Sequence, residues 1–385
     1  MKALEQAFME KFGEGEEVAS FFAPGRVNLI GEHTDYNGGH VFPCALSVGT
    51  YAVARKRKDS ILRFYSMNFE EQGVIEATID DLHYVESDDW ANYPKGVIEQ
   101  FRQAGHRVET GYEVAFYGNI PNGAGLSSSA SIELATAVMI KELEGLKVTE
   151  LDMIQLSQKA ENEFVGVNCG IMDQFAIGKG KKDHAILLNC DTLDYRHTPV
   201  KLKKESLIIA NTNKRRGLAD SAYNERRTQC EEAVKDLQHR LPIQSLGEVT
   251  EEQFQQYESL IQSEDVKRRA KHVITENART IQAVDYLDNG DIEGFGRLMN
   301  ESHKSLRDDY EVTGEELDAL VEAAWDQGAI GSRMTGAGFG GCTISIVPNE
   351  KVEAFIHAVS ERYTERTGLV ADFYTVEIGD GAKRL

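Results

Sequence analysis

The sequence is poor in proline and cysteine, contains no long hydrophobic run, and has far fewer basic than acidic residues. It has only seven prolines and neither an internal repeat nor a low-complexity tract, which excludes repeat and proline-rich architectures. Its apolar runs fall well short of the roughly 18 residues that span a bilayer, so a membrane-spanning helix is excluded. The acidic, amphipathic residues 1–17 lack the apolar core of a signal peptide, and we expect a cytoplasmic protein without membrane contacts.

Cysteine usage and charge exclude further classes. The five cysteines are scattered, form no C-x-x-C pair and have no histidine spaced for zinc, so we expect reduced thiols. With 63 acidic against 42 basic residues, the net charge of −21 disfavours binding to nucleic acid or anionic lipid. The same charge repels a nucleotide at long range, so a nucleotide site would need local cations.

The chain length of 385 residues exceeds what one hydrophobic core usually holds and predicts two domains. Apolar runs predict strands at 18–30, 47–57, 61–69, 73–79, 111–121, 184–190, 206–213, 342–348 and 371–378, the last of which closes the chain. Helical spacing predicts helices at 90–105, 130–146, 149–166, 265–287, 313–328 and 350–366. A strand-rich first half and a helix-rich second half predict α+β domains at 1–200 and 201–385, with a ligand cleft between them.

A segment rich in glycine and serine, PNGAGLSSSASIE at 121–133, precedes a predicted helix. Gly123 and Gly125 allow the backbone to approach a ligand closely, and the helix expected to begin near Ser128 has unpaired N–H groups at its positive end. Phosphate binds such a helix start without the lysine of the usual P-loop, and serine hydroxyls can ligate Mg²⁺. The alternative is a turn followed by serines that only cap a structural helix.

A second glycine cluster, MTGAGFGGCT at 334–343, lies just before the predicted strand at 342–348. It also offers bare backbone for close approach to a ligand. By itself it is equally typical of a hairpin or a bulge. Two such clusters in one chain favour a nucleotide site.

Polar side chains are dense at residues 24–39, PGRVNLIGEHTDYNGG, which follow an apolar strand. Such density suits a sugar, whose hydroxyls each need hydrogen-bonding partners. The residues concerned are Arg26, Asn28, Glu32, His33, Asp35 and Tyr36. The tail at 35–39 alone is typical of a turn, with His33 at the surface. A metal site of His33, Glu32 and Asp35 is less favoured because only one histidine is present.

Four motifs in this order resemble the galactokinases, which belong to a superfamily of sugar and small-alcohol kinases that includes homoserine, mevalonate and phosphomevalonate kinases. The motifs are GRVNLIGEHTDYNGG, PNGAGLSSSAS, CGIMDQF at 169–175 and MTGAGFGGC. The first is particular to galactokinases and their close relatives, and the resemblance spans nearly the entire chain. It implies an α+β, two-domain GHMP-kinase-like fold with the active site in the cleft between the domains.

The resemblance implies catalytic roles for two residues. Asp173 matches the aspartate thought to take the proton from the C1 hydroxyl of the sugar as that hydroxyl attacks the γ-phosphate of ATP. Arg26 matches a nearby arginine that would keep Asp173 ionised and balance charge in the transition state. In a loose transition state the attacking hydroxyl forms little bond to phosphorus and needs little activation. The alternative is therefore that Asp173 only orients the hydroxyl. Without the other motifs, an aspartate here is also typical of a helix cap or a core hydrogen bond.

The resemblance further implies which residues contact each ligand. Sugar contacts are expected from Glu32, His33, Thr34, Asp35, Gly170 and Tyr223. Nucleotide contacts are expected from Ser66, Trp90, Gly123, Ala124, Gly125, Leu126, Ser127, Ser128 and Ser129. Mg²⁺ is expected on Ser129 and Glu161, with ATP as co-substrate. The basic segment at 213–227, which contains Tyr223, is interpreted as a solvated helix face, with nucleotide steering as the alternative.

We therefore predict transfer of phosphate from ATP to the C1 hydroxyl of D-galactose, giving galactose 1-phosphate and ADP. One alternative is a kinase for a related sugar such as N-acetylgalactosamine, which needs extra room beside C2. Another is a non-catalytic sensor of galactose and ATP that regulates transcription. A sensor is expected to lack the phosphate loop or Asp173, and both are intact. We expect galactose and ATP as partners and a monomer or weak homo-oligomer.

Overall fold

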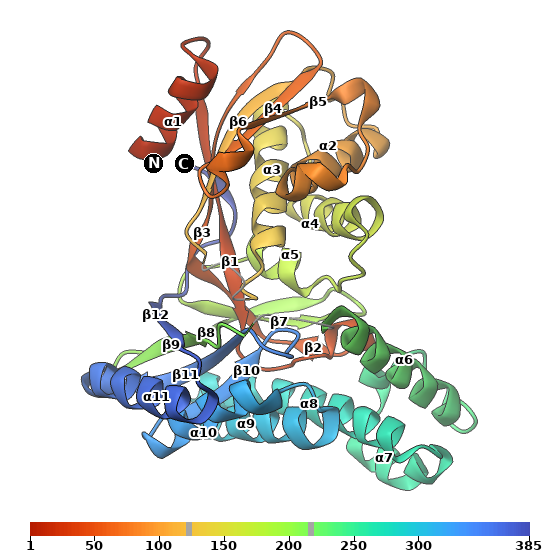
Figure 1. The fold of residues 1–385 in the computed structure, drawn as a ribbon. Helices are drawn as coiled ribbons and strands as arrows, with labels where there is room; N and C mark the ends of the chain where they lie inside the picture. Colours follow the sequence, from red (N-terminus) through yellow and green to blue (C-terminus); the bar gives the residue numbers. More distant parts are fainter. Residues whose placement is uncertain (121–124, 215–218) are drawn as a thin grey trace.

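The computed structural model describes residues 1–120, 125–214 and 219–385. Within these residues the strands form three sheets, and helices cover the two larger ones (Figure 1). The strand orders are β13-β1-β3-β6-β4-β5, β10-β11-β9-β12 and β2-β7-β8. The predicted α+β fold is confirmed.

The strands are β1 (Ala19–Asn28), β2 (His40–Val41), β3 (Pro43–Lys56), β4 (Ile61–Ser66), β5 (Val74–Thr78), β6 (Tyr112–Gly118), β7 (His184–Asn189), β8 (Tyr195–Pro199), β9 (Glu205–Asn211), β10 (Gly331–Thr335), β11 (Cys342–Pro348), β12 (Asp372–Val376) and β13 (Lys383–Arg384). The α-helices are α1 (Lys2–Phe12), α2 (Asn92–Gln103), α3 (Ser128–Glu144), α4 (Glu150–Lys159), α5 (Met172–Gly178), α6 (Ala219–Leu237), α7 (Glu251–Tyr257), α8 (Glu264–Asp288), α9 (Ile292–Ser305), α10 (Gly314–Asp326) and α11 (Val352–Thr367). Helix α4 continues into a π-helical segment, Ala160–Val165. No helix in the described parts of the chain is long and apolar enough to cross a membrane.

The six-stranded sheet has helices on both faces. Helices α2 to α5 cover one face and α1 the other (Figure 1). Side chains alternate across β6, as its sequence pattern predicts: Tyr112, Val114 and Phe116 face α2 to α5, whereas Ala115 packs beside Phe8 of α1. Both faces of this sheet therefore carry packed helices, and the N-terminus of α3 points towards the second half of the chain (Figure 1).

The four-stranded sheet joins the two halves of the chain through a shared core. On β9, Ile208 and Ala210 face α10 and α11, whereas Ile209 packs against the α8 and α9 side. The cluster around Ile209 also contains Val27 of β1 and Phe42. The predicted domain boundary near residue 200 falls between β8 and β9, and the two-domain division stays a prediction.

The structure adds several elements to the predicted ones, and two of them lie at the ends of the chain. The N-terminal stretch forms a helix, α1, whose Leu4, Phe8 and Phe12 pack under the sheet. The prediction that 371–378 is the last strand is wrong, because β13 follows it. The two exposed residues of β13 have no apolar alternation of their own, and they become a strand only by pairing with Phe21 and Phe22 of β1.

A fully buried carboxylate on α8 holds the loop that follows β1. Glu276 accepts hydrogen bonds from the backbone nitrogens of Gly31, at 3.0 Å, and Glu32, at 3.3 Å, and from Arg279 Nε at 2.9 Å. Burial alone would raise the pKa of Glu276, but the neighbouring Arg279 guanidinium, with other nearby cations, lowers this pKa to about 2. The carboxylate therefore fixes the loop backbone over the whole neutral range.

We expect Glu276→Gln to lower the free energy of unfolding at pH 7 by about 3 kcal/mol, because the partly buried Arg279 loses its partner charge. The folded-state pKa lies below the ordinary value near 4.5, so this contribution is present above pH 4.5 and is lost as the pH falls towards 2. Urea unfolding between pH 7 and 3.5 measures the difference. The matched control is Glu301→Gln on the exposed face of α9. A difference that does not shrink below pH 4.5 would contradict the assignment.

Candidate active site

Arg26 of β1 and Asp173 in the first turn of α5 form a two-pronged ion pair. Arg26 Nε lies 2.7 Å from Asp173 Oδ1, and Nη2 lies 2.8 Å from Oδ2. Burial by itself lowers the pKa of Arg26, but the carboxylates of Asp173, Glu32 and Asp35 raise it above its ordinary value. The guanidinium is therefore a permanent cation next to a carboxylate that is still partly exposed.

The phosphate loop reaches the same aspartate through Ser127. This residue precedes α3 with φ +60° and makes no capping hydrogen bond. Its hydroxyl instead donates to Asp173 Oδ2. The alternative that the serines only cap a structural helix is therefore wrong for Ser127, and its left-handed backbone is typical of a functional site. The predicted contacts Gly123 and Ala124 lie outside the described residues.

Backbone contacts hold the rest of the phosphate loop against β1. Arg26 donates from its backbone nitrogen to Leu126 O, at 3.1 Å, and from Nη1 to Gly125 O, at 2.8 Å. A Cβ on Gly25 would lie 2.8 Å from Leu126 O, so this approach requires a glycine at 25. The glycine cluster at 334–343 is the β10–β11 hairpin and also meets the loop, because a Cβ on Gly336 would contact Gly125 O at 3.5 Å.

Glu32 is buried at the junction of the two halves of the chain. Its Oε1 accepts hydrogen bonds from Arg333 Nη1 at 3.3 Å, Thr335 Oγ1 at 3.1 Å and the backbone nitrogen of Gly336 at 2.8 Å. These donors come from β10 and its hairpin, some 300 residues further along the chain. The expected sugar contact is thus fixed in place by the second half of the protein.

His33 is buried, so the alternative that it is a surface residue is wrong. Its Nδ1 lies 2.8 Å from the Tyr36 hydroxyl, and its ring centroid lies 5.8 Å from that of Tyr223 on α6. Burial, with the positive charges nearby, lowers the pKa of His33 to about 3, so the imidazole is neutral at pH 7. Thr34 differs from His33: it is fully buried, and its hydroxyl lies within donating distance of two carbonyl oxygens, that of His40 at 2.6 Å and that of Gly31 at 3.0 Å.

Asp35 and Gly170 lie directly against each other. A Cβ on Gly170 would collide with the Asp35 carboxylate, so a glycine at 170 leaves room for that side chain. Burial and then the charge of Asp173 raise the pKa of Asp35 to about 6. The structure therefore brings the predicted residues from three motifs to one place.

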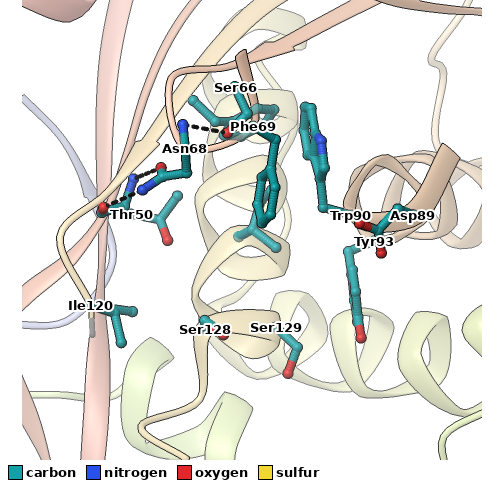
Figure 2. A pocket seen from close by; sticks show the side chains of 13 residues that line it. Thr50, Ser66, Asn68, Phe69, Asp89, Trp90, Tyr93, Ile120, Ser128 and Ser129 are labelled. Carbon is teal, nitrogen blue, oxygen red and sulfur yellow. Dashed lines mark hydrogen bonds between the residues drawn. The ribbon is translucent and has the colours of Figure 1, made fainter. Parts of the chain in front are cut away.

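A cavity of about 240 Å³ lies between the six-stranded sheet and the start of α3 (Figure 2). The predicted nucleotide residues Ser66 and Trp90 line it, together with Ser128 and Ser129. The Trp90 ring lies nearly parallel to that of Phe69, at 11° and 6.4 Å between centroids. Figure 2 shows these two rings above the two serines. The cavity thus presents aromatic faces at one end and a helix start at the other.

The two predicted metal ligands, Ser129 and Glu161, lie near each other. Glu161 lies in the π-helical segment after α4, and its carboxylate is close enough to the Ser129 hydroxyl for that hydroxyl to favour the ionised form. Burial, followed by the charge of Asp173, raises the pKa of Glu161. In the described parts of the chain no three His, Cys, Asp or Glu residues form a metal cluster. A hydroxyl and a carboxylate fit Mg²⁺, which takes its other oxygen ligands from phosphates and water.

The basic segment at 213–227 does not form a uniformly solvated face. Arg226 is buried and donates from Nε to Tyr310 O at 2.7 Å and from Nη2 to Glu311 O at 3.1 Å. The favoured interpretation is therefore wrong for this residue, because its side chain satisfies the carbonyls after α9. Tyr223, one turn earlier on α6, faces the sugar residues instead.

The sequence interpretation missed several residues around the site. They are Glu276, Arg333 and Thr335 around Glu32, Tyr310 beside Tyr36, Asn68, Phe69, Asp89 and Tyr93 in the nucleotide cavity, and Glu133 and Gln174 beside Glu161. Glu133 carried a local signal, since a carboxylate stands there within an apolar helix. The partners of Glu32 had none, because they lie far away in the sequence.

Three family models match the chain. They are the galactokinase galactose-binding signature at residues 6–56, the GHMP kinases N terminal domain at 92–181 and the GHMP kinases C terminal at 283–365. The galactokinase of Fusobacterium nucleatum is 60% identical over 98% of both chains. The galactokinase of Bacillus subtilis is 57% identical over 99% of this chain and 98% of its own length.

Solved structures show the same relationship. The Lactococcus lactis galactokinase complexed with galactose has a TM-score of 0.97 and 48% identity, covering 100% of this chain and 99% of its own. The Methanococcus jannaschii mevalonate kinase, at 16% identity, has a TM-score of 0.65, covers 95% of this chain and 99% of its own, and shares the fold alone. From its motifs, fold and relatives, the chain belongs to the galactokinase family and is an ATP-dependent sugar kinase.

Proposed function

We propose that the chain transfers the γ-phosphate of ATP to the C1 hydroxyl of D-galactose, giving galactose 1-phosphate and ADP. The observation that supports this reaction best is the convergence of Arg26, Asp173 and Ser127, which places a carboxylate, a cation and the phosphate loop at one point. Phosphoryl transfer depends mainly on positioning and on neutralising charge, and these groups supply both.

Asp173 has room for one more hydrogen bond of the kind that a sugar hydroxyl donates. An ionised carboxylate accepts about four hydrogen bonds, and Asp173 accepts two from Arg26 and one from Ser127. Because these three bonds also fix the carboxylate, it would hold the C1 hydroxyl in line with the phosphate. Asp173 therefore orients the nucleophile and takes its proton as the new P–O bond forms.

The remaining sugar hydroxyls are proposed to bind Glu32, His33, Asp35 and Tyr223. The carboxylates of Glu32 and Asp35 accept hydrogen bonds, and the imidazole of His33 is neutral and carries one donor and one acceptor nitrogen. Gly170 keeps its side of the pocket open for Asp35. Thr34 would act indirectly by holding the loop.

The triphosphate is proposed to bind at the start of α3, where Ser128 and Ser129 present helix N–H groups and hydroxyls to the cavity. Ser129 and Glu161 would hold Mg²⁺, which would supply positive charge to offset that of the phosphates. The base would lie against Trp90 and Phe69, in the part of the cavity that Ser66 also lines. We also infer that the protein works in the cytoplasm, where ATP is available and thiols are kept reduced.

A coupled assay of ADP release tests the reaction over a panel of sugars with MgATP. We expect turnover with galactose and at least 100-fold lower kcat/KM with glucose or N-acetylgalactosamine, because buried polar groups discriminate strongly when a partner is missing. Turnover with N-acetylgalactosamine but not with galactose would mean that the proposed substrate is wrong. Binding of ATP and galactose without release of ADP would mean that the protein is a non-catalytic sensor.

Asp173→Asn tests the catalytic aspartate. We expect kcat to fall by at least 1000-fold while ATP binding, measured by calorimetry, changes little, because the amide neither accepts the proton nor neutralises Arg26. Ser127→Ala, which removes one of the three bonds to Asp173, is expected to lower kcat by about 10-fold. Loss of the folded state in Asp173→Asn, with normal activity in Ser127→Ala, would instead identify Asp173 as a core residue.

Protonation of Asp35 is expected to lower kcat/KM for galactose as the pH falls below about 6, which gives the pH profile an acid limb. Because its folded pKa is about 6, the carboxylate that accepts sugar hydroxyls protonates below that pH, and kcat/KM for galactose should fall. Asp35→Asn should lower kcat/KM at pH 7 and remove this limb.

The same substitution has an opposite effect on stability. The folded pKa of Asp35 lies above its ordinary value of 3.8, so ionisation costs stability as the pH rises from about 4 to 6. Asp35→Asn should therefore raise the free energy of unfolding at pH 7 but not at pH 4. A variant with lower stability at both pH values would show that Asp35 supports the fold and is not held there for binding.

A further inference from the structure

A buried carboxylate and amide lie beside the proposed cation ligand Glu161, and no step described above uses them. Glu133 lies on α3 one turn after Ser129 and is fully buried. Gln174 Nε2 donates to Glu133 Oε2 at 3.0 Å and to Glu161 Oε2 at 2.6 Å. Both hydrogens of one amide are thus shared between two carboxylates, and Gln174 joins Glu133 to Glu161.

Two oxygen atoms in the cluster of Glu133, Gln174 and Glu161 accept no hydrogen bond from the described residues. Neither Glu133 Oε1 nor Gln174 Oε1 has a hydrogen-bond partner among the described residues. Reversing the amide of Gln174 would pair its oxygen only if Glu133 carried a proton; burial and then the charge of Glu161 do raise the pKa of Glu133 well above its ordinary value, but a cation nearby favours the ionised form. A buried acceptor without a partner costs about 1–3 kcal/mol, so two of them in one cluster indicate a donor that the protein chain itself does not supply.

A hydrated divalent cation at Ser129 and Glu161 supplies such donors. Magnesium keeps several of its water molecules when it binds to protein carboxylates, and each of these waters presents hydrogens to nearby oxygens. Residues in this position commonly orient the direct ligands of a metal, and their loss typically lowers metal affinity 10- to 100-fold. The geometry of Glu133 and Gln174 matches this role.

We propose that Glu133 and Gln174 are positioning residues of the cation site. Gln174 holds the Glu161 carboxylate towards the cation, and the two unpartnered oxygens accept hydrogen bonds from water molecules on the cation. This inference rests on the proposed site at Ser129 and Glu161. It adds a second carboxylate that tunes cation affinity without binding the metal directly.

The test measures Mn²⁺ binding to the complex of the enzyme with ADP, by the electron paramagnetic resonance signal of free Mn²⁺. We expect Glu133→Gln to weaken Mn²⁺ binding 10- to 100-fold and to raise the Mg²⁺ concentration needed for half-maximal kcat by a similar factor. Gln174→Met should have the same effect and provides a second readout if Glu133→Gln does not fold. Calorimetric titration with galactose checks that each variant keeps its sugar site.

Glu144→Gln is the matched control, because Glu144 also lies on α3 with a side chain only 8% exposed, but it pairs with Lys56 and Tyr112 away from the site. It should leave Mn²⁺ affinity unchanged. If Glu161→Gln weakens Mn²⁺ binding while Glu133→Gln and Gln174→Met do not, an ordinary buried water satisfies the cluster and the inference is wrong. If Glu161→Gln also has no effect, the cation site itself is wrong.

Discussion

The ion pair between Arg26 and Asp173 connects segments that are almost 150 residues apart. One guanidinium holds both oxygens of Asp173 and also the carbonyl of Gly125, so the position of α5 is tied to the position of the phosphate loop. Ser127 closes this arrangement from the loop side. Because a planar guanidinium bonds in fixed directions, a shift in any one segment strains the other two. Precise alignment of a hydroxyl with a phosphate needs such rigidity.

The second half of the chain contributes to the site mainly by holding the first half. Glu276 fixes the backbone of the sugar loop, and Arg333 and Gly336 fix the side chain of Glu32. These contacts are buried, where unpaired charges are costly, so the loop has one favourable position when the halves are assembled. The shared core around Val27 and Ile209 explains how the halves stay assembled.

Charge in the site is balanced locally, in contrast to the acidic surface. Several carboxylates converge near the place where an anionic nucleotide would bind, and burial together with their mutual repulsion raises the pKa of Asp35 and Glu161. Arg26 and the N–H groups at the start of α3 are the fixed positive partners in the described structure. A cation on Glu161 would relieve the same repulsion, which makes nucleotide and cation binding mutually favourable.

The sequence by itself determined most of the longer elements and much of the local chemistry. Apolar periodicity placed β11 and α10, and the glycines and serines before Ser128 marked the start of α3, because these features depend on neighbours within a few residues. Family resemblance named Asp173 and Arg26. The pairing that makes β13 a strand and the release of Ser127 from capping had no local signal. The tertiary structure alone decided those features, as it decided the partners of Glu32 and the bridge from Glu133 to Glu161, because each depends on buried contacts between residues distant in sequence.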